Sequence, residues 1–117
     1  MLKKKYRLKN YKAFVATYKL KHTVSDSNMC IYFGKEKQSP DINTKIAFVV
    51  SKKIHKRAVV RNRIKRLMRE SFRLILKNSE AENIHKYLSV ICVAKPDSVN
   101  SDFKTISLSL SSLLSSR

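Results

Sequence analysis

The residues with the clearest chemical signature in this chain are nine Lys or Arg side chains in the eighteen positions of residues 52–69. The block reads KKIHKRAVVRNRIKRLMR, contains no acid, and follows an apolar run at residues 46–50. A strand that leads into a basic helix can hold many cations rigidly on one surface. Such a surface is suited to binding a polyanion.

The side chains that would let the chain catalyse a reaction by itself are few and dispersed. Its three histidines have no Cys or carboxylate at ligand spacing, which argues against a metal centre held by protein side chains. Gly34 is the only glycine, so a Gly-rich phosphate loop is excluded. None of the eight acids lies in an apolar strand, where a two-metal nuclease usually anchors its carboxylates. Glu70, with Arg66 at i−4 and Arg73 at i+3, is expected to form an intrahelical ion pair.

The longest helical pattern covers residues 58–77 and has two chemically distinct sides. The apolar side, spaced at about 100° per residue, consists of Val60, Ile64, Leu67, Met68, Phe72 and Ile75. The opposite side carries Arg61, Asn62, Lys65, Arg66, Arg69 and Arg73, and Arg63 lies apart from them. Within it Arg61, Lys65 and Arg69, here called the cationic row, repeat at i, i+4 and i+8, where like charges destabilise a helix slightly. A bound anion would offset that repulsion.

The remaining elements predict an α+β fold. Asn10 is the expected N-cap of a helix at residues 10–20, and helical spacing also predicts a helix at 101–117. Apolar segments predict strands at 28–34, 45–51 and 87–95. The last two are apolar on both sides and are expected to be central, so the helix between them forms a βαβ unit. We expect one domain, residues 1–117, with a small mixed sheet of about four strands and three helices in the order helix, strand, strand, helix, strand, helix.

The charge of the chain is high and unevenly distributed. The net charge is +18, and residues 1–76 hold 21 Lys or Arg against four acids. This segregation favours nucleic acid as the partner, with an anionic membrane surface as the weaker alternative. No apolar run is long enough to span a membrane, and Cys30 and Cys92 are expected to be reduced thiols in a cytoplasmic protein. On these residues alone, a ribosomal protein, a protein nuclease and a DNA-binding helix module remain open.

Four segments resemble the bacterial ribonuclease P protein component. They are VSKK at 50–53 with RNRIKRLMRESF at 61–72, RLKNYKAF at 7–14, and YLSVICVAKP at 87–96. The resemblance implies a subunit of a ribonucleoprotein endonuclease, in which a catalytic RNA cleaves precursor tRNA with Mg²⁺ held mainly by the RNA. The protein would bind that RNA and the 5′ leader of the precursor, favour substrate over product, and require no membrane and no protein partner. It also implies a left-handed crossover around the basic helix, against the usual right-handed rule.

The same resemblance assigns roles to individual residues. The residues implied to bind the catalytic RNA are Arg61, Asn62, Arg63, Lys65, Arg66 and Arg69. The residues implied to line a leader-binding cleft between the first helix and the sheet are Phe14, Tyr18, Tyr32, Ser51, Lys52 and Lys53. Stacking on aromatic rings beside cations suits a single strand whose sequence varies. Many members of the family carry Gly between the VSKK motif and the RNR motif. Residues 54–60, which link these motifs in this chain, contain no Gly, so their conformation is not predicted.

Overall fold

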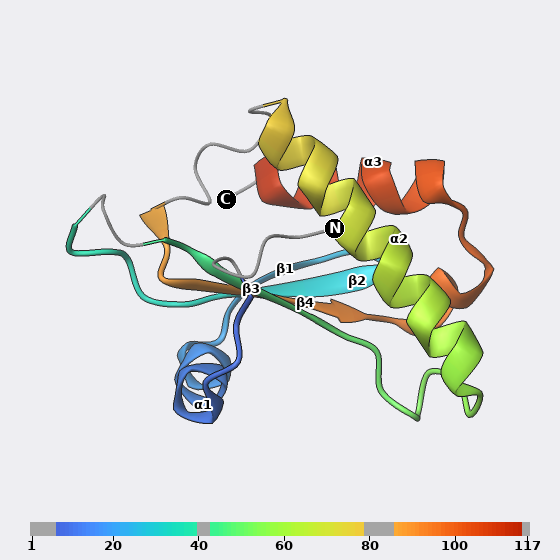
Figure 1. Cartoon of the computed structure of the whole chain (residues 1–117), viewed down its shortest axis with the longest axis horizontal. Helices are drawn as coiled ribbons and strands as arrows, with labels where there is room; N and C mark the ends of the chain where they lie inside the picture. Colours follow the sequence, from blue (N-terminus) through green and yellow to red (C-terminus); the bar gives the residue numbers. More distant parts are fainter. Residues whose placement is uncertain (1–6, 40–42, 79–85, 116–117) are drawn as a thin grey trace.

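The computed structural model describes residues 7–39, 43–78 and 86–115 and has three layers (Figure 1). The elements in chain order are α1 (Tyr11–Leu20), β1 (His22–Ser25), β2 (Met29–Phe33), β3 (Lys45–Val49), α2 (Ala58–Lys77), β4 (Ser89–Ala94), the 3-10 helix η3 (Pro96–Asn100) and α3 (Phe103–Ser115). Helix α1 covers one face of the sheet, and α2 with α3 covers the other (Figure 1). The α+β class, the three helices and the four-stranded mixed sheet are confirmed.

The sheet has the strand order β1-β2-β4-β3. Strand β2 pairs antiparallel with β1 and β4, whereas β3 runs parallel to β4. Because α2 connects β3 to β4, the predicted βαβ unit is present; its left-handed sense stays an expectation from the resemblance. Strand β4 is central, as its apolar faces predicted.

Strand β3 lies at the edge of the sheet, so its expected central position was wrong. Its two faces are nevertheless covered, with Phe48 packing towards α2 and Ala47 towards α1. Its outer edge is partly covered as well, because Arg7 bridges to Ile46 and the backbone N–H of Leu8 donates to the Ile46 carbonyl at 2.8 Å. An edge strand covered in this way has the apolar pattern of a central one.

Strand β1 is absent from the predicted element order, which the structure therefore corrects. It is four residues long, three of them are exposed, and it pairs only with β2 at the other edge of the sheet. Helix α1 ends at Leu20, and the next residue, Lys21, has a φ of 54° in the left-handed region, which reverses the chain before β1. A short exposed strand leaves no alternating apolar signal in the sequence.

Two sides of the sheet carry separate apolar clusters. In β2, Met29, Ile31 and Phe33 are fully buried towards α2 and α3, while Tyr32 packs on the α1 side, as the alternation predicted. The buried stripe of α2 matches the predicted apolar side at Ile64, Met68, Phe72 and Ile75. Burial of these side chains fixes the rotation of α2 about its axis. The cationic side must therefore face away from the core.

Helix α1 is held close to the sheet at two points. The Asn10 side chain caps its start by accepting from the backbone N–H groups of Lys12 and Ala13 at 2.9 and 3.3 Å, as predicted. The Thr17 and Ser89 hydroxyls form a buried hydrogen bond of 2.5 Å between helix and β4. Gly34 permits this packing, because a Cβ there would collide with the Ser89 Oγ. These contacts set the position of the aromatic residues of α1.

Candidate nucleic-acid interface

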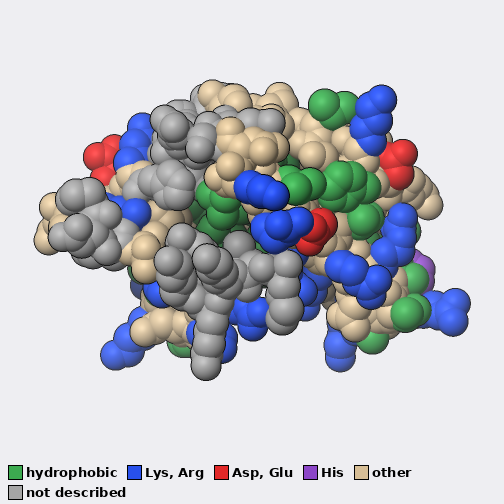
Figure 2. Space-filling view, turned by 45° about the horizontal axis from the view of Figure 1, so that its top comes forward, with side chains coloured by type: hydrophobic (Ala, Val, Ile, Leu, Met, Phe, Trp, Pro, Cys, Tyr) green, Lys and Arg blue, Asp and Glu red, His purple; other side chains and the backbone are tan. Residues whose placement is uncertain are grey.

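The cationic row lies along α2 outside its buried stripe, and its Lys65 and Arg69 lie beside β3. Arg61, Lys65 and Arg69 are half-buried, whereas Asn62 and Arg66 are exposed. Phe48 contacts Phe72 edge to face at 5.7 Å between ring centroids, which holds this part of α2 against β3. On the face seen in Figure 2, Lys and Arg side chains far outnumber Asp and Glu. The row is thus a rigidly mounted cationic surface.

Arg63 points elsewhere, as its separate place in the sequence pattern indicated. Its guanidinium Nη2 donates to the Ser101 carbonyl at 3.3 Å, which joins α2 to the connection between η3 and α3. Of the six residues expected to bind catalytic RNA, Arg63 is therefore the one that the structure directs towards the η3–α3 connection. The other five remain together on α2.

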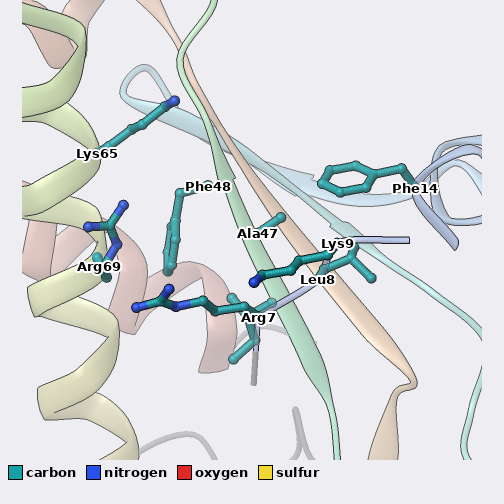
Figure 3. Close-up of a pocket in the computed structure, with 9 residues that line it drawn as sticks. Arg7, Leu8, Lys9, Phe14, Ala47, Phe48, Lys65 and Arg69 are labelled. Carbon is teal, nitrogen blue, oxygen red and sulfur yellow. The ribbon is translucent and has the colours of Figure 1, made fainter. Parts of the chain in front are cut away.

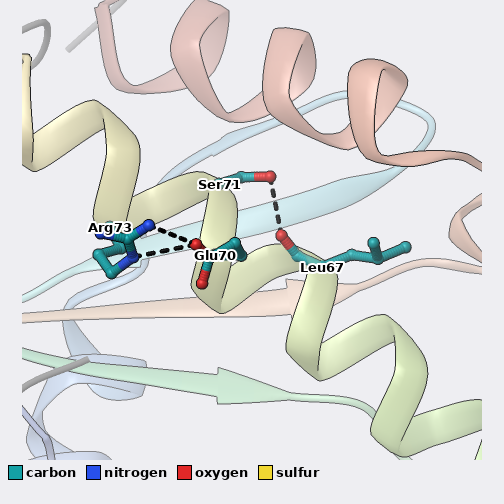
Figure 4. Close-up of polar contacts among 4 residues, drawn as sticks. All are labelled: Leu67, Glu70, Ser71 and Arg73. Atoms are coloured by element: carbon teal, nitrogen blue, oxygen red, sulfur yellow. Dashed lines mark hydrogen bonds and ion pairs between the residues drawn. The ribbon is translucent and has the colours of Figure 1, made fainter. Parts of the chain in front are cut away.

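The predicted ion pair of Glu70 forms with Arg73. The Arg73 Nε and Nη2 donate to Glu70 Oε1 at 3.0 and 2.5 Å, on a part of α2 that is open to solvent (Figure 4). This hydrogen bonding and charge hold the pKa of Glu70 below its ordinary value and raise the pKa of Arg73. On the neighbouring side, the buried Ser71 hydroxyl donates to the Leu67 carbonyl at 2.8 Å, so this polar group is satisfied within the helix. Arg73 is thus engaged within the helix.

A cavity of about 360 Å³, here called the edge cavity, opens beside β3 (Figure 3). Its described lining consists of Arg7, Leu8, Lys9, Phe14, Ile46, Ala47, Phe48, Lys65 and Arg69. Four of these side chains are cationic, and they come from the N-terminal segment and from α2. Arg7 and Lys9 were not among the predicted site residues. The only signal for them in the sequence is the motif RLKN before α1.

The three aromatic residues predicted for the leader cleft do come together between α1 and the sheet. Phe14 and Tyr18 have ring centroids 6.5 Å apart, and Tyr18 meets Tyr32 edge to face at 4.7 Å. All three, here called the aromatic row, are half-buried and belong to the α1-side cluster. Each ring therefore leaves part of its surface open to a ligand.

The polar residues predicted for the same cleft follow β3. Val49 packs in the α1-side cluster, and Ser51, Lys52 and Lys53 are exposed just beyond it. Residues 51–54 form a turn in which the Ile54 N–H donates to the Ser51 carbonyl at 3.0 Å, and α2 begins at Ala58. The link without glycine is thus a turn followed by a short irregular segment that ends in the extended residue Arg57. It presents both lysines to solvent.

We expect Tyr18 and Tyr32 to ionise later than a free tyrosine. Partial burial raises the pKa of both phenols, and Cys30 adds to the rise, as the neighbouring Tyr32 does for Tyr18. Because the folded pKa lies above the unfolded value, this contribution to stability is present below the ordinary tyrosine pKa and is lost as pH rises through the folded value. Phenolate ionisation can be followed by ultraviolet absorbance as pH rises. Compared with the wild type, Tyr18→Phe and Tyr32→Phe should each lack one tyrosine that ionises late. Loss of a group that titrates like free tyrosine would contradict the packing of the aromatic row.

The side chains that could bind a metal ion are His, Cys, Asp and Glu among the described residues. Within residues 7–39, 43–78 and 86–115, no three His, Cys, Asp or Glu side chains gather closely enough to hold an ion. Cys92 is buried, and that burial raises the pKa of its thiol. None of the helices in the described part of the chain is long and apolar enough to cross a membrane.

Comparison with known proteins agrees with the resemblance. Residues 2–116 match the sequence model of the Ribonuclease P family. The ribonuclease P protein component of Oceanobacillus iheyensis is 34% identical over 113 residues, which cover 97% of this chain and 87% of that protein. The protein component of Clostridium botulinum is 33% identical over 111 residues, covering 95% and 93%.

Solved structures show the same fold. The ribonuclease P protein of Staphylococcus aureus superimposes with a TM-score of 0.76 at 28% identity, covering 94% of this chain and 93% of that one. The protein from Thermotoga maritima has a TM-score of 0.76 at 21% identity, covering 95% and 96%, and supports the fold alone. Members of this family take part in an endoribonuclease complex together with the ribonuclease P RNA. The chain therefore belongs to the ribonuclease P protein component family and is a subunit of ribonuclease P.

Proposed function

We propose that this chain is the accessory subunit of ribonuclease P, that its active site lies in the RNA, and that it binds the 5′ leader of precursor tRNA. The observation that carries the proposal is the edge cavity, where Phe14 of the aromatic row lines the same space as Lys65 and Arg69 of the cationic row. Stacking surfaces for a single strand thus adjoin cations for phosphates. No further protein partner is needed for either contact.

Docking on the catalytic RNA is assigned to the outward side of α2. Arg61, Asn62, Lys65, Arg66 and Arg69 would contact its phosphates, with Arg63 acting at the η3 side of the helix. Arg and Lys contacts to phosphates set affinity and register without reading the base sequence. This is appropriate for a protein that recognises one folded RNA by shape and charge.

Leader binding is assigned to the α1 side of the sheet. The aromatic row would stack bases, and Ser51, Lys52 and Lys53 would contact the backbone of the same strand. Neither kind of contact requires a particular leader sequence. The protein would favour the precursor over mature tRNA, because only the precursor carries the leader.

Mg²⁺ is assigned to the RNA. A hard cation takes oxygen ligands, chiefly carboxylates in proteins, and the described donors of this chain do not form such a set. Phosphate oxygens of the RNA supply those ligands instead. The cations of the protein would reduce repulsion between the two RNAs and so lower the Mg²⁺ concentration needed to assemble them.

Reconstitution tests the proposal. Catalytic RNA from the source organism is mixed with precursor tRNA across a Mg²⁺ series, with and without the protein. We expect the protein to restore leader removal at low Mg²⁺ and to cleave nothing when the RNA is omitted. Cleavage by the protein alone would identify a protein nuclease. A Mg²⁺ requirement that the protein leaves unchanged would contradict the accessory role.

A further inference from the structure

We propose that the edge cavity is a phosphate-binding site for RNA and that Arg7 and Lys9, together with Lys65 and Arg69, form it. The inference rests on the proposed function and adds a third RNA contact, located between the cationic row and the aromatic row. It also gives the N-terminal segment at residues 7–9 a role in binding, beyond leading into α1.

The backbone explains why Arg7 and Lys9 face α2. Leu8 is only 8% exposed, packs in the α1-side cluster, and is held to β3 by its hydrogen bond to Ile46. In an extended segment, neighbouring side chains point to opposite sides. Burial of Leu8 on the α1 side therefore directs Arg7 and Lys9 towards the other side, and Figure 3 shows both reaching into the cavity.

Helix α2 supplies the other two cations of the edge cavity. Lys65 and Arg69 are one turn apart and extend towards β3, on the far side of Phe48 from Ala47 (Figure 3). The described lining contains four cations and no carboxylate. Cations that share a confined space repel one another, and an anion placed among them adds attractive interactions that offset this repulsion. The charge of the described lining thus favours an anionic occupant.

The rest of the lining specifies which anion. The apolar part of the lining, here called the floor, wraps around the edge of β3, with Ile46 and Phe48 from the α2-side cluster and Phe14 and Ala47 from the α1-side cluster. The volume of about 360 Å³ is in the range of small-ligand pockets. A nucleotide unit of RNA combines these two requirements, since its phosphate meets the cations while its sugar or base meets the floor. Phe48 cannot turn away easily, because its other side contacts Phe72.

The test compares Arg7→Gln/Lys9→Gln with a control of equal charge loss, Lys19→Gln/Lys104→Gln, whose exposed side chains lie on α1 and α3 outside the cavity. Binding is measured against salt in two arms, catalytic RNA alone and precursor tRNA added to the assembled holoenzyme. We expect the cavity variant to lose about two units of the log–log salt slope in at least one arm, roughly one unit for each phosphate that is no longer bound. The arm that changes identifies the RNA that supplies the phosphate.

A second measurement tests whether the four cations act together. Adding Arg7→Gln/Lys9→Gln to Lys65→Gln/Arg69→Gln should weaken binding by less than the product of the separate effects, because all four contact the same phosphate region. Arg7→Lys/Lys9→Arg, which keeps the charges, should restore the slope and exclude an effect on folding.

Two outcomes would overturn the inference: a slope equal to that of the control in both arms, or fully multiplicative effects. Failure of the wild-type protein to bind either RNA would instead contradict the proposed function, so the two failures are distinguishable.

Discussion

Replacing Arg61, Lys65 and Arg69 together by Gln should cause the largest loss of catalytic-RNA binding among variants of this protein. The three side chains form one row on a helix whose apolar stripe at Ile64, Met68, Phe72 and Ile75 is buried, so they cannot be redistributed by rotating the helix. Each phosphate that is no longer bound should flatten the log–log salt dependence by about one unit, or roughly three units in total. Binding measured at several salt concentrations checks this directly.

The thermal stability of this variant should not fall with its RNA affinity. Like charges at i, i+4 spacing destabilise a helix by about 0.2–0.5 kcal/mol per pair, and the row contains two such pairs. The variant should therefore unfold at the same temperature as the wild type or slightly higher. A fall in RNA affinity with unchanged thermal stability would separate a binding role from a structural one.

The matched control removes three exposed charges elsewhere, in Lys12→Gln/Lys19→Gln/Lys104→Gln. Its net charge equals that of the row variant, so long-range attraction to RNA is reduced equally in both. A salt slope that falls as much in this control as in the row variant would show that only net charge matters. The row would then be an ordinary solvated face of α2.

Local sequence signals predicted the parts of the fold that depend on neighbours along the chain. The apolar and cationic sides of α2 follow from a period of 3.6 residues sustained over five turns, and its bounds at Ala58 and Lys77 are as predicted. The Asn10 cap needs only backbone groups two and three residues further along the chain. The alternation of buried and partly buried residues in β2 is also local, because successive side chains of one strand point to opposite faces.

Other features depend on pairing between distant segments and leave little local signal. Nothing near Arg7 and Lys9 indicates that their segment runs beside Ile46, so their place in the edge cavity became visible only from the fold. The edge position of β3 could not be predicted for the same reason. The segment at Arg7 and two helices cover this strand, so its residues are as apolar as those of a central strand. Arg63 is the intermediate case, because its angle on α2 predicted its separation but not its bond to Ser101.

Tyr32→Ala should weaken binding of leader-bearing substrate by about 1–3 kcal/mol, the cost of removing one stacking partner from a bound base. Tyr32 lies on the α1 side of β2, while its neighbours Ile31 and Phe33 are buried on the other side. Truncation therefore leaves the larger core intact. It also removes the edge contact with Tyr18, which is worth about 0.5–1.5 kcal/mol of stability, so binding must be measured well below the unfolding temperature.

Comparing two substrates isolates the leader contact from that packing effect. Tyr32→Ala should weaken binding of precursor tRNA to the holoenzyme but leave binding of mature tRNA unchanged, because only the precursor places bases on the aromatic row. Tyr32→Phe keeps the ring and should bind both like the wild type. Tyr11→Ala removes an aromatic side chain that is 79% exposed and outside the row, and should have no effect. Equal losses for precursor and mature tRNA in Tyr32→Ala would mean that this ring supports the fold without touching the leader.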